Sequence, residues 1–187
     1  MAQAVTPFLK KRYLEKVVPE LRKSRGYANP HQVPNLVKIT LNSAFDAEAD
    51  KSTRDEVVKE ITKLAGQKPV ITKARKSVSN FKVREGLETA AMVTIRRERM
   101  WHFLDRLINL ATPRIKDFRG LGDKAFDKQG NYAMGLTEQG VFPEINMVDA
   151  PFTHGMNINM CFRNSSPKLS RFVLAELGMP FAKPDQK

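Results

Sequence analysis

The sequence predicts a two-layer α+β domain in which a β-sheet carries helices on one face. Hydropathy patterns typical of helices and strands follow one another in the order helix, strand, helix, strands, helix, strands, helix. The 187 residues are 41% apolar, which is enough for one packed core. Because the sequence shows no repeat, linker or low-complexity tract, we expect residues 1–187 to form a single domain.

The first expected element is an N-terminal helix over about 7–24. Thr6 is expected to be its N-cap and Pro7 its first helical residue, where a missing N–H costs nothing. Pro19 should kink or interrupt this helix, because proline removes a backbone donor. Apolar residues recur at helical spacing along one side of it: Leu9, Tyr13, Leu14, Val17, Val18 and Leu21.

A half-buried strand and a second helix are expected next. After a loop over 24–34, apolar and polar residues alternate in the order Val37, Lys38, Ile39, Thr40, Leu41, Asn42. Ser52 followed by Asp55 resembles a capping box at the start of the second helix. Gly66 should end that helix.

Two more strands and a third helix are predicted in the middle of the chain. Residues 69–72 read as a short strand and 90–97 as another, and the intervening 73–86 is too long for a tight turn. The third helix spans about 98–111, and Pro113 should stop it. Its core stripe comprises Phe103, Leu104, Leu107 and Ile108.

The C-terminal part should supply the last strands and helix. Short strands are expected near 132–134, within the glycine-containing region 120–140. Residues 156–162 alternate between apolar and polar side chains, which is typical of an amphipathic strand. Ser166 begins and Gly178 ends the last helix. The apolar stripe of this helix comprises Leu169, Phe172, Val173 and Leu177.

The charge of the chain points to a polyanionic partner. There are 32 Lys plus Arg against 20 Asp plus Glu, which gives a net charge of +12. Residues 68–119 hold 13 basic and 5 acidic side chains, whereas 120–187 carry no net charge. A local excess of this size attracts anions, and a basic face for solubility alone is a weaker explanation.

The densest positive segment is 72–84, which contains no acidic residue. Its cations are Lys73, Arg75, Lys76, Lys82 and Arg84. Ser77, Ser79 and Asn80 add neutral hydrogen-bonding groups, and Phe81 offers a surface on which an unpaired base can stack. This combination favours RNA over a merely solvated, mobile loop, and we expect the 73–86 loop to protrude.

The predicted strands add a second polar surface. Arg96, Arg97 and Arg99 adjoin the end of the strand over 90–97. Thr40, Asn42, Thr94 and Arg96 should share one side of the sheet. A sheet face of this composition can contact riboses and phosphates in the shallow minor groove of RNA.

The sequence contains no recognisable catalytic or metal site. His31, His102 and His154 do not lie at metal-ligand spacing, and Cys161 is the only cysteine. The stretch over 120–125 matches a degenerate dinucleotide pattern but does not follow an apolar strand, so we interpret it as a loop. We predict no cofactor and no catalytic residue. An RNA-directed enzyme and a general nucleic-acid-binding module remain the alternatives.

The sequence also favours a cytoplasmic location. No window approaches the roughly 18 apolar residues of a membrane-spanning helix, so we expect no membrane partner. Residues 1–11 lack the apolar stretch of a secretory signal. A single cysteine excludes an internal disulfide and fits a reducing compartment.

Six sequence blocks together resemble a known family. They are GQKP at 66–69, TKARKSV at 72–78, ERMW at 98–101, PRIKDFRGL at 113–121, GNY at 130–132 and FPEI at 142–145. In this order, over about 7–181, they are similar to the bacterial form of large-subunit ribosomal protein five, the 5S rRNA-binding family of the central protuberance. The resemblance implies a mostly antiparallel sheet, covered by helices on one face and open to 5S rRNA on the other.

The resemblance also implies residue roles and partners. Asn42, Gln67 and Thr94 match the family's RNA-contacting polar residues, while Lys68, Arg96, Arg97 and Arg99 would add salt-sensitive affinity. The 73–86 loop would face the peptidyl-site tRNA and a protein of the small-subunit head, through Lys73, Arg75, Lys76, Ser77, Phe81, Lys82 and Arg84. Further implied partners are 23S-type rRNA and other large-subunit proteins.

Two segments depart from the family pattern. Ser43, Ala44 and Phe45 stand where a glycine-rich turn usually follows Asn42, so the backbone beside that residue should differ. Asn146 and Met147 replace the usual acidic and aromatic residues, so we expect an altered local loop over 146–155.

Overall fold

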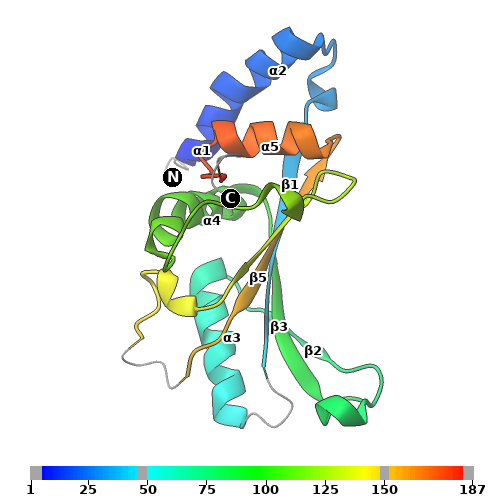
Figure 1. Ribbon diagram of the computed structural model, residues 1–187, viewed down its shortest axis with the longest axis vertical. Helices are drawn as coiled ribbons and strands as arrows, with labels where there is room; N and C mark the ends of the chain where they lie inside the picture. The colour runs from blue at the N-terminus through cyan, green and yellow to red at the C-terminus, as the bar shows by residue number, and fades with distance from the viewer. Residues whose placement is uncertain (1–5, 46–49, 148–151, 183–187) are drawn as a thin grey trace, which may run out of the picture.

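A computed structural model describes residues 6–45, 50–147 and 152–182. At its centre lies a five-stranded antiparallel sheet with the strand order β2-β3-β1-β5-β4 (Figure 1). The strands are β1 (Asn35–Ala44), β2 (Val70–Lys73), β3 (Glu88–Ile95), β4 (Tyr132–Leu136) and β5 (Met156–Arg163). Helices pack on one side of the sheet, which confirms the predicted two-layer α+β class.

The helices are α1 (Phe8–Arg12), α2 (Val18–Arg25), α3 (Lys51–Ala65), α4 (Arg97–Arg106) and α5 (Pro167–Glu176). A π-helical turn, Tyr13–Val17, joins α1 to α2, and a second one, Leu107–Ala111, extends α4. Helix α3 contacts β3, and α4 contacts β1 and α1. The helix pair α1–α2 thus lies beyond the end of the sheet, next to α4 and α5 (Figure 1).

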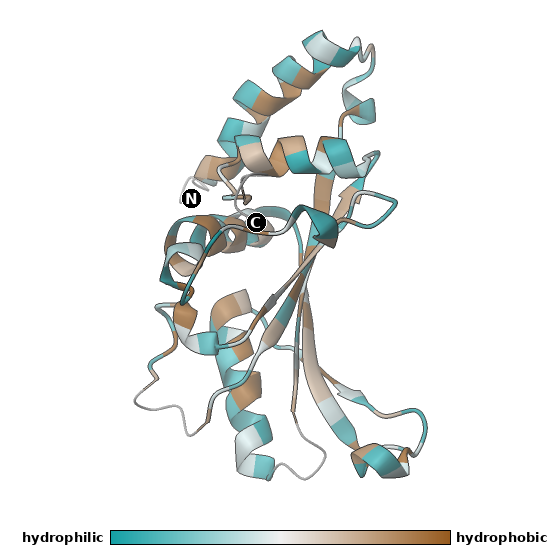
Figure 2. Cartoon of the chain, in the orientation of Figure 1, coloured by the Kyte–Doolittle hydropathy of each residue, from teal (hydrophilic) through white to brown (hydrophobic). Residues whose placement is uncertain are grey.

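The core lies between the sheet and the helices. Ile39 and Ile95 on neighbouring strands are completely buried, as is Leu104 of α4. Trp101 is also part of the core, and its ring centroid lies 5.5 Å from that of Tyr13. Hydrophobic and hydrophilic bands alternate along α2 and α3 in Figure 2, as expected for helices with one buried side.

The N-terminal helix differs from the prediction in its cap but not at Pro19. Pro7, not Thr6, is the N-cap, and no side chain caps this end. Val18 N–H donates to the carbonyl of Tyr13, five residues back instead of the usual four. The hydrogen-bonding pattern therefore changes from α to π directly before Pro19. Pro19 comes just after this turn, so the α-helical bonding pattern is interrupted there as predicted, although the chain stays helical to Arg25.

The predicted alternation in β1 is wrong at its first residue. A β-bulge between Leu36 and Lys38 shifts the register with β5. As a result Leu36, and not Val37, is buried beside Ile39. The polar residues Lys38, Thr40 and Asn42 still share the other face, as expected.

The other helix ends need smaller corrections. Helix α3 begins at Lys51 with Asp50 as N-cap, so Ser52 does not cap it, whereas Gly66 ends it in the left-handed conformation as predicted. Pro113 does not stop the third helix at once, because a 3-10 turn, Thr112–Arg114, follows the π turn. Ser166 is the N-cap of α5, as predicted.

The stretch between β2 and β3 folds into two nested turns. The backbone N–H of Val78 donates to the carbonyl of Val83, and the N–H of Val83 donates to the carbonyl of Val78. These two bonds enclose the 3-10 turn Ser79–Phe81. Closer to the strands, Gly86 N–H donates to the carbonyl of Ala74 at 2.9 Å. This stretch lies at the end of the β2–β3 pair that is remote from α4 (Figure 1).

Candidate RNA-binding surface

The face of the sheet opposite the helices carries small and polar side chains. The alternation of each strand directs its apolar residues into the core and the remaining ones to this side. We call this surface the open face. Its residues are Lys38, Thr40 and Asn42 of β1, Met92 and Thr94 of β3, Ala133 and Gly135 of β4, and Asn157, Asn159 and Cys161 of β5.

The strand register arranges the open face in rows. Asn42 lies between Met92 and Asn157, and the next row places Thr40 between Thr94 and Asn159. On the edge strand β4 the row neighbours of Asn157 and Asn159 are Gly135 and Ala133. Because these two residues are so small, the amide groups border a shallow hollow.

The open face brings together two of the predicted contact residues and adds two amides that were not predicted as contacts. Asn42 and Thr94 lie on adjacent strands, two residues apart in register and therefore in neighbouring rows. The sequence predicts that Asn157 and Asn159 alternate with apolar residues, but it assigns neither of them to RNA. The alternation was a sufficient signal, because it placed both amides on an exposed strand face.

Gln67 is held at the edge of the sheet. Its Nε2 donates to the backbone carbonyl of Thr94 at 2.8 Å. Strand β2 pairs with β3 only from Val70 opposite Met92 onward, so Gln67 satisfies an edge carbonyl that β2 does not reach. The neighbouring Lys68 is exposed. Gln67 therefore has a structural role as well as a place beside the open face.

The three arginines at the β3–α4 junction are exposed. Arg96 is the N-cap of α4, and Arg97 has a left-handed backbone with φ of 55°. Within 6–45, 50–147 and 152–182, no ion pair involves Arg96, Arg97 or Arg99. Their charges are available to an anionic ligand.

The basic turns over 73–86 form a separate positive surface. Lys73, Arg75, Lys76, Lys82 and Arg84 lie in this segment, and Phe81 at its tip is 74% exposed. Ser77 Oγ accepts a hydrogen bond from Glu85 N–H at 2.9 Å, which uses a lone pair of the oxygen and not its proton. Eight residues of β3 separate this segment from the arginines, a distance of about 25 Å.

A buried polar network lies directly behind Asn42. Ser43 is fully buried, and its Oγ lies 2.8 Å from both His154 Nδ1 and the carbonyl of Gly155. His154 Nε2 lies 2.6 Å from Glu60 Oε2. Although serine, histidine and glutamate occur in this order in hydrolases, a fully buried hydroxyl cannot reach a substrate. The network instead ties β1 to α3 and to the start of β5.

The chain matches two models of one family. The model for ribosomal protein L5 covers residues 29–84, and the model for the C-terminal part of that family covers 88–181. The chain belongs to the ribosomal protein L5 family. The first model includes Asn42, Gln67 and residues 73–84 of the basic turns, and the second includes Thr94 and the arginines of the β3–α4 junction.

Relatives from several bacteria share nearly the full length of this L5-family chain. The large ribosomal subunit protein uL5 of Bdellovibrio bacteriovorus is 50% identical over 173 residues, which is 92% of this chain and 97% of the relative. The protein of the same name from Leifsonia xyli subsp. xyli is 46% identical over 181 residues, 96% and 93% of the two chains. That of Trichodesmium erythraeum is 45% identical over 174 residues, 92% and 96%.

Membership of the L5 family makes the chain a structural constituent of the large ribosomal subunit. The alternative of an RNA-directed enzyme is therefore wrong. Ribosomal RNA and other ribosomal proteins are its partners at this level of detail. Among the helices that the structure describes, none is long and apolar enough to cross a membrane.

Proposed function

We propose that the open face binds 5S rRNA and helps to anchor it, together with 23S-type rRNA, in the central protuberance of the large subunit. One observation carries this proposal: four amide and hydroxyl side chains, Thr40, Asn42, Asn157 and Asn159, lie side by side on an exposed sheet. Such groups can donate hydrogen bonds to ribose hydroxyls and base edges and can accept hydrogen bonds from them. This function places the chain in the cytoplasmic ribosome.

Affinity and selectivity come from different residues. Asn42, Gln67 and Thr94 would select the RNA through hydrogen bonds, with Asn157 and Asn159 completing the same rows. The cations Lys68, Arg96, Arg97 and Arg99 would contact phosphates, which releases counterions and makes the affinity depend on salt. Mutating an amide should therefore weaken binding without changing its salt dependence.

The basic turns over 73–86 serve a second RNA in this proposal. They would contact the peptidyl-site tRNA and take part in a bridge to a protein of the small-subunit head. Two features support this division: the turns lie about 25 Å from the arginines of the β3–α4 junction, and Phe81 is exposed at their tip. An exposed ring beside lysines and arginines suits a base or loop that is not paired.

A titration of 5S rRNA with Asn42→Ala tests the proposal. Loss of the amide should weaken binding at least several-fold at constant salt, because each good polar contact contributes about 1 to 3 kcal/mol. The matched control is Asn109→Ala, since Asn109 is exposed on the helix side and its side chain bonds only to the half-buried Asp105 within the described structure. Equal binding by the wild type and by Asn42→Ala would contradict an RNA site on the open face.

Cys161 offers an independent readout of the same face. Its partly exposed thiol lies in register with Lys38, at the margin of the open face. Bound 5S rRNA should slow its reaction with a maleimide, whereas DNA of equal length at equal concentration should not. If DNA protected the thiol equally, the chain would behave as a general nucleic-acid-binding module.

Sedimentation of a lysate in sucrose at moderate salt is a further test. Recovery of the protein in free fractions, away from large subunits, would contradict the proposal.

A further inference from the structure

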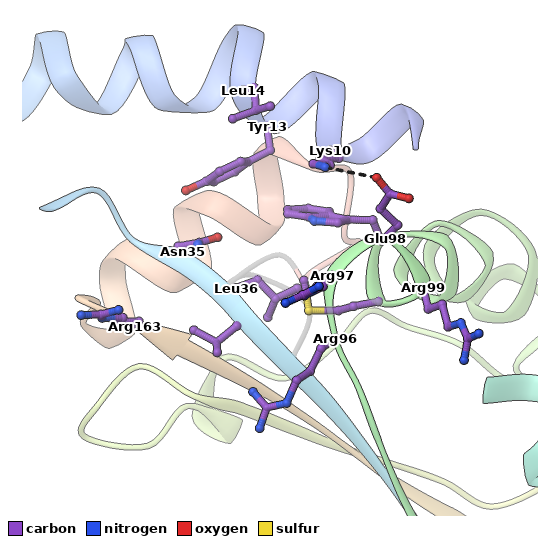
Figure 3. Close-up of a pocket in the computed structure, with 13 residues that line it drawn as sticks. Lys10, Tyr13, Leu14, Asn35, Leu36, Arg96, Arg97, Glu98, Arg99 and Arg163 are labelled. Carbon is purple, nitrogen blue, oxygen red and sulfur yellow. Dashed lines mark ion pairs between the residues drawn. The ribbon is translucent and has the colours of Figure 1, made fainter. Parts of the chain in front are cut away.

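An open groove of about 920 Å³ lies between the N-terminal helix, the first residues of β1 and the β3–α4 junction (Figure 3). Its floor is apolar, with Leu36, Met100 and Trp101 all buried. Its rim carries five cations and a single carboxylate: Lys10, Arg96, Arg97, Arg99, Arg163 and Glu98. We call this feature the arginine groove.

The charges of the arginine groove are largely uncompensated. Glu98 lies 3.6 Å from Lys10 and so pairs with the one lysine of the rim. None of the four arginines takes part in an ion pair within the part of the chain that the structure describes. Four guanidinium groups around one groove repel each other, and an anion would relieve that repulsion.

The backbone at Arg97 is held in an unfavourable conformation. Its φ of 55° lies in the left-handed region, which costs a non-glycine residue about 1 to 2 kcal/mol. Arg96, by contrast, is extended with φ of −136°. The side chains of Arg96 and Arg97 leave the junction in different directions, and both line the groove (Figure 3).

The walls of the groove are fixed before any ligand arrives. Tyr13 donates its hydroxyl proton to the carbonyl of Pro34 at 2.7 Å, which holds the N-terminal helix over the start of β1. The Tyr13 ring also packs on Trp101 of α4. Arg163 enters from β5, where it lies in register with Asn35. Positions fixed in this way reduce the entropy lost on binding.

We infer that the arginine groove binds the sugar–phosphate backbone of the same RNA that covers the open face. The inference rests on the proposed function and extends it to residues outside that face, namely Lys10, Asn35 and Arg163. An extended polyanion fits better than a single phosphate compound, because the arginines are spread around an open groove. Arg96 and Lys38 connect the groove to the open face, so one strand can contact both.

The test measures the affinity for 5S rRNA across a range of salt concentrations. Arg97→Gln combined with Arg163→Gln removes two phosphate contacts, so the slope of log K against log salt should fall by about 1.4 to 1.8 in magnitude. The matched control, Lys59→Gln with Lys63→Gln, removes the same charge from the exposed side of α3 and should retain the wild-type slope.

A single variant separates binding from folding. Glycine adopts a left-handed backbone without strain, so Arg97→Gly should not lower the midpoint of urea unfolding. It should nevertheless reduce the salt slope by about 0.7 to 0.9, the share of one phosphate contact. If Arg97 had only a structural role, Arg97→Gly would lower the midpoint of urea unfolding and leave the salt slope unchanged. That result would overturn the inference.

The inference and the proposed function can fail separately. If Asn42→Ala weakens 5S rRNA binding while both groove variants keep the wild-type slope, the groove does not bind RNA and the phosphate contact proposed for Arg97 fails with it, but RNA binding by the open face stands. If the wild-type protein binds 5S rRNA no better than DNA, the proposed function itself fails.

Discussion

His154 Nε2 lies 2.6 Å from Glu60 Oε2 in a site where both side chains are almost completely buried. The same imidazole contacts Ser43 through Nδ1, and Ser43 is the residue directly after Asn42. The backbone N–H of His154 donates to Gln139 Oε1 at 2.8 Å. His154 thus joins three other segments of the chain, at residues 43, 60 and 139, behind the end of β1, where we place an RNA contact.

Removing one partner of this buried pair should destabilise the fold strongly. His154→Ala leaves the Glu60 carboxylate buried without its imidazole, which should cost about 3 to 5 kcal/mol in urea unfolding. Combining it with Glu60→Ala should cost less than the two single changes added together. Lys59→Ala, which breaks the exposed pair with Glu56, is the control and should cost less than about 1 kcal/mol. Additive effects of His154 and Glu60 would show that the pair is not coupled.

Gln67→Ala should affect both stability and RNA binding. The change leaves the carbonyl of Thr94 without its partner at the sheet edge, a loss of about 1 to 3 kcal/mol in unfolding free energy. Gln67→Glu should lower stability as well, because a carboxylate cannot donate to a carbonyl. Chemical denaturation of the three proteins measures the effect. An unchanged midpoint in both variants would exclude the structural bond as a contribution to stability.

The two basic surfaces should separate in a binding experiment. Replacing Lys73, Arg75 and Lys76 by Ala leaves the open face intact, so 5S rRNA binding should stay close to that of the wild type. Binding of tRNA in the peptidyl site of ribosomes carrying the variant should be weakened. If the triple variant lost 5S rRNA binding as fully as Asn42→Ala, the division between two surfaces would be wrong.

Two buried tyrosines should make the fold sensitive to alkali. Burial raises the pKa of Tyr13 to about 12, and burial together with the Asp123 carboxylate raises the pKa of Tyr132 to about 12. An unfolded chain releases these protons from about pH 10, whereas the folded chain retains them. Stability should therefore fall as the pH rises from 10 to 12.

Tyr13→Phe should make that alkaline loss of stability shallower, because the proton of Tyr13 no longer contributes. Urea unfolding at several pH values between 9 and 12 measures the slope. At neutral pH the same variant should be less stable than the wild type, since the bond to the Pro34 carbonyl is lost. An identical pH slope in both proteins would mean that Tyr13 ionises equally in the folded and unfolded chains.

Hydropathy patterns predicted most elements because each strand is exposed on one face. Met156, Ile158 and Met160 are buried and the residues between them are not, as the alternation requires. The pattern was misleading at Val37, where a bulge adds one residue. The bulge does not alter the hydropathy of the sequence, so it could not be read from it.

The candidate site was only partly predictable. Asn42 and Thr94 were predicted from the family resemblance and from the alternation of their strands, and the register places them on adjacent strands in neighbouring rows. The Ser43–His154 contact joins residues 111 positions apart, and the Gln67–Thr94 bond spans 27 positions. Contacts of this kind depend on tertiary packing, and no local pattern encodes them. Arg163 was missed for the same reason, because only the strand pairing brings it to the arginine groove.

The strand order also sets when the open face can exist during synthesis. β1 is made early, but it lies between β3 and β5, and the Asn157 and Asn159 rows need a strand that ends at Arg163. A nascent chain that has emerged only as far as β4 lacks β5, and with it the Asn157 and Asn159 side chains of the open face. If the open face binds RNA as proposed, the protein becomes competent to bind it only after β5 has left the ribosome that makes it.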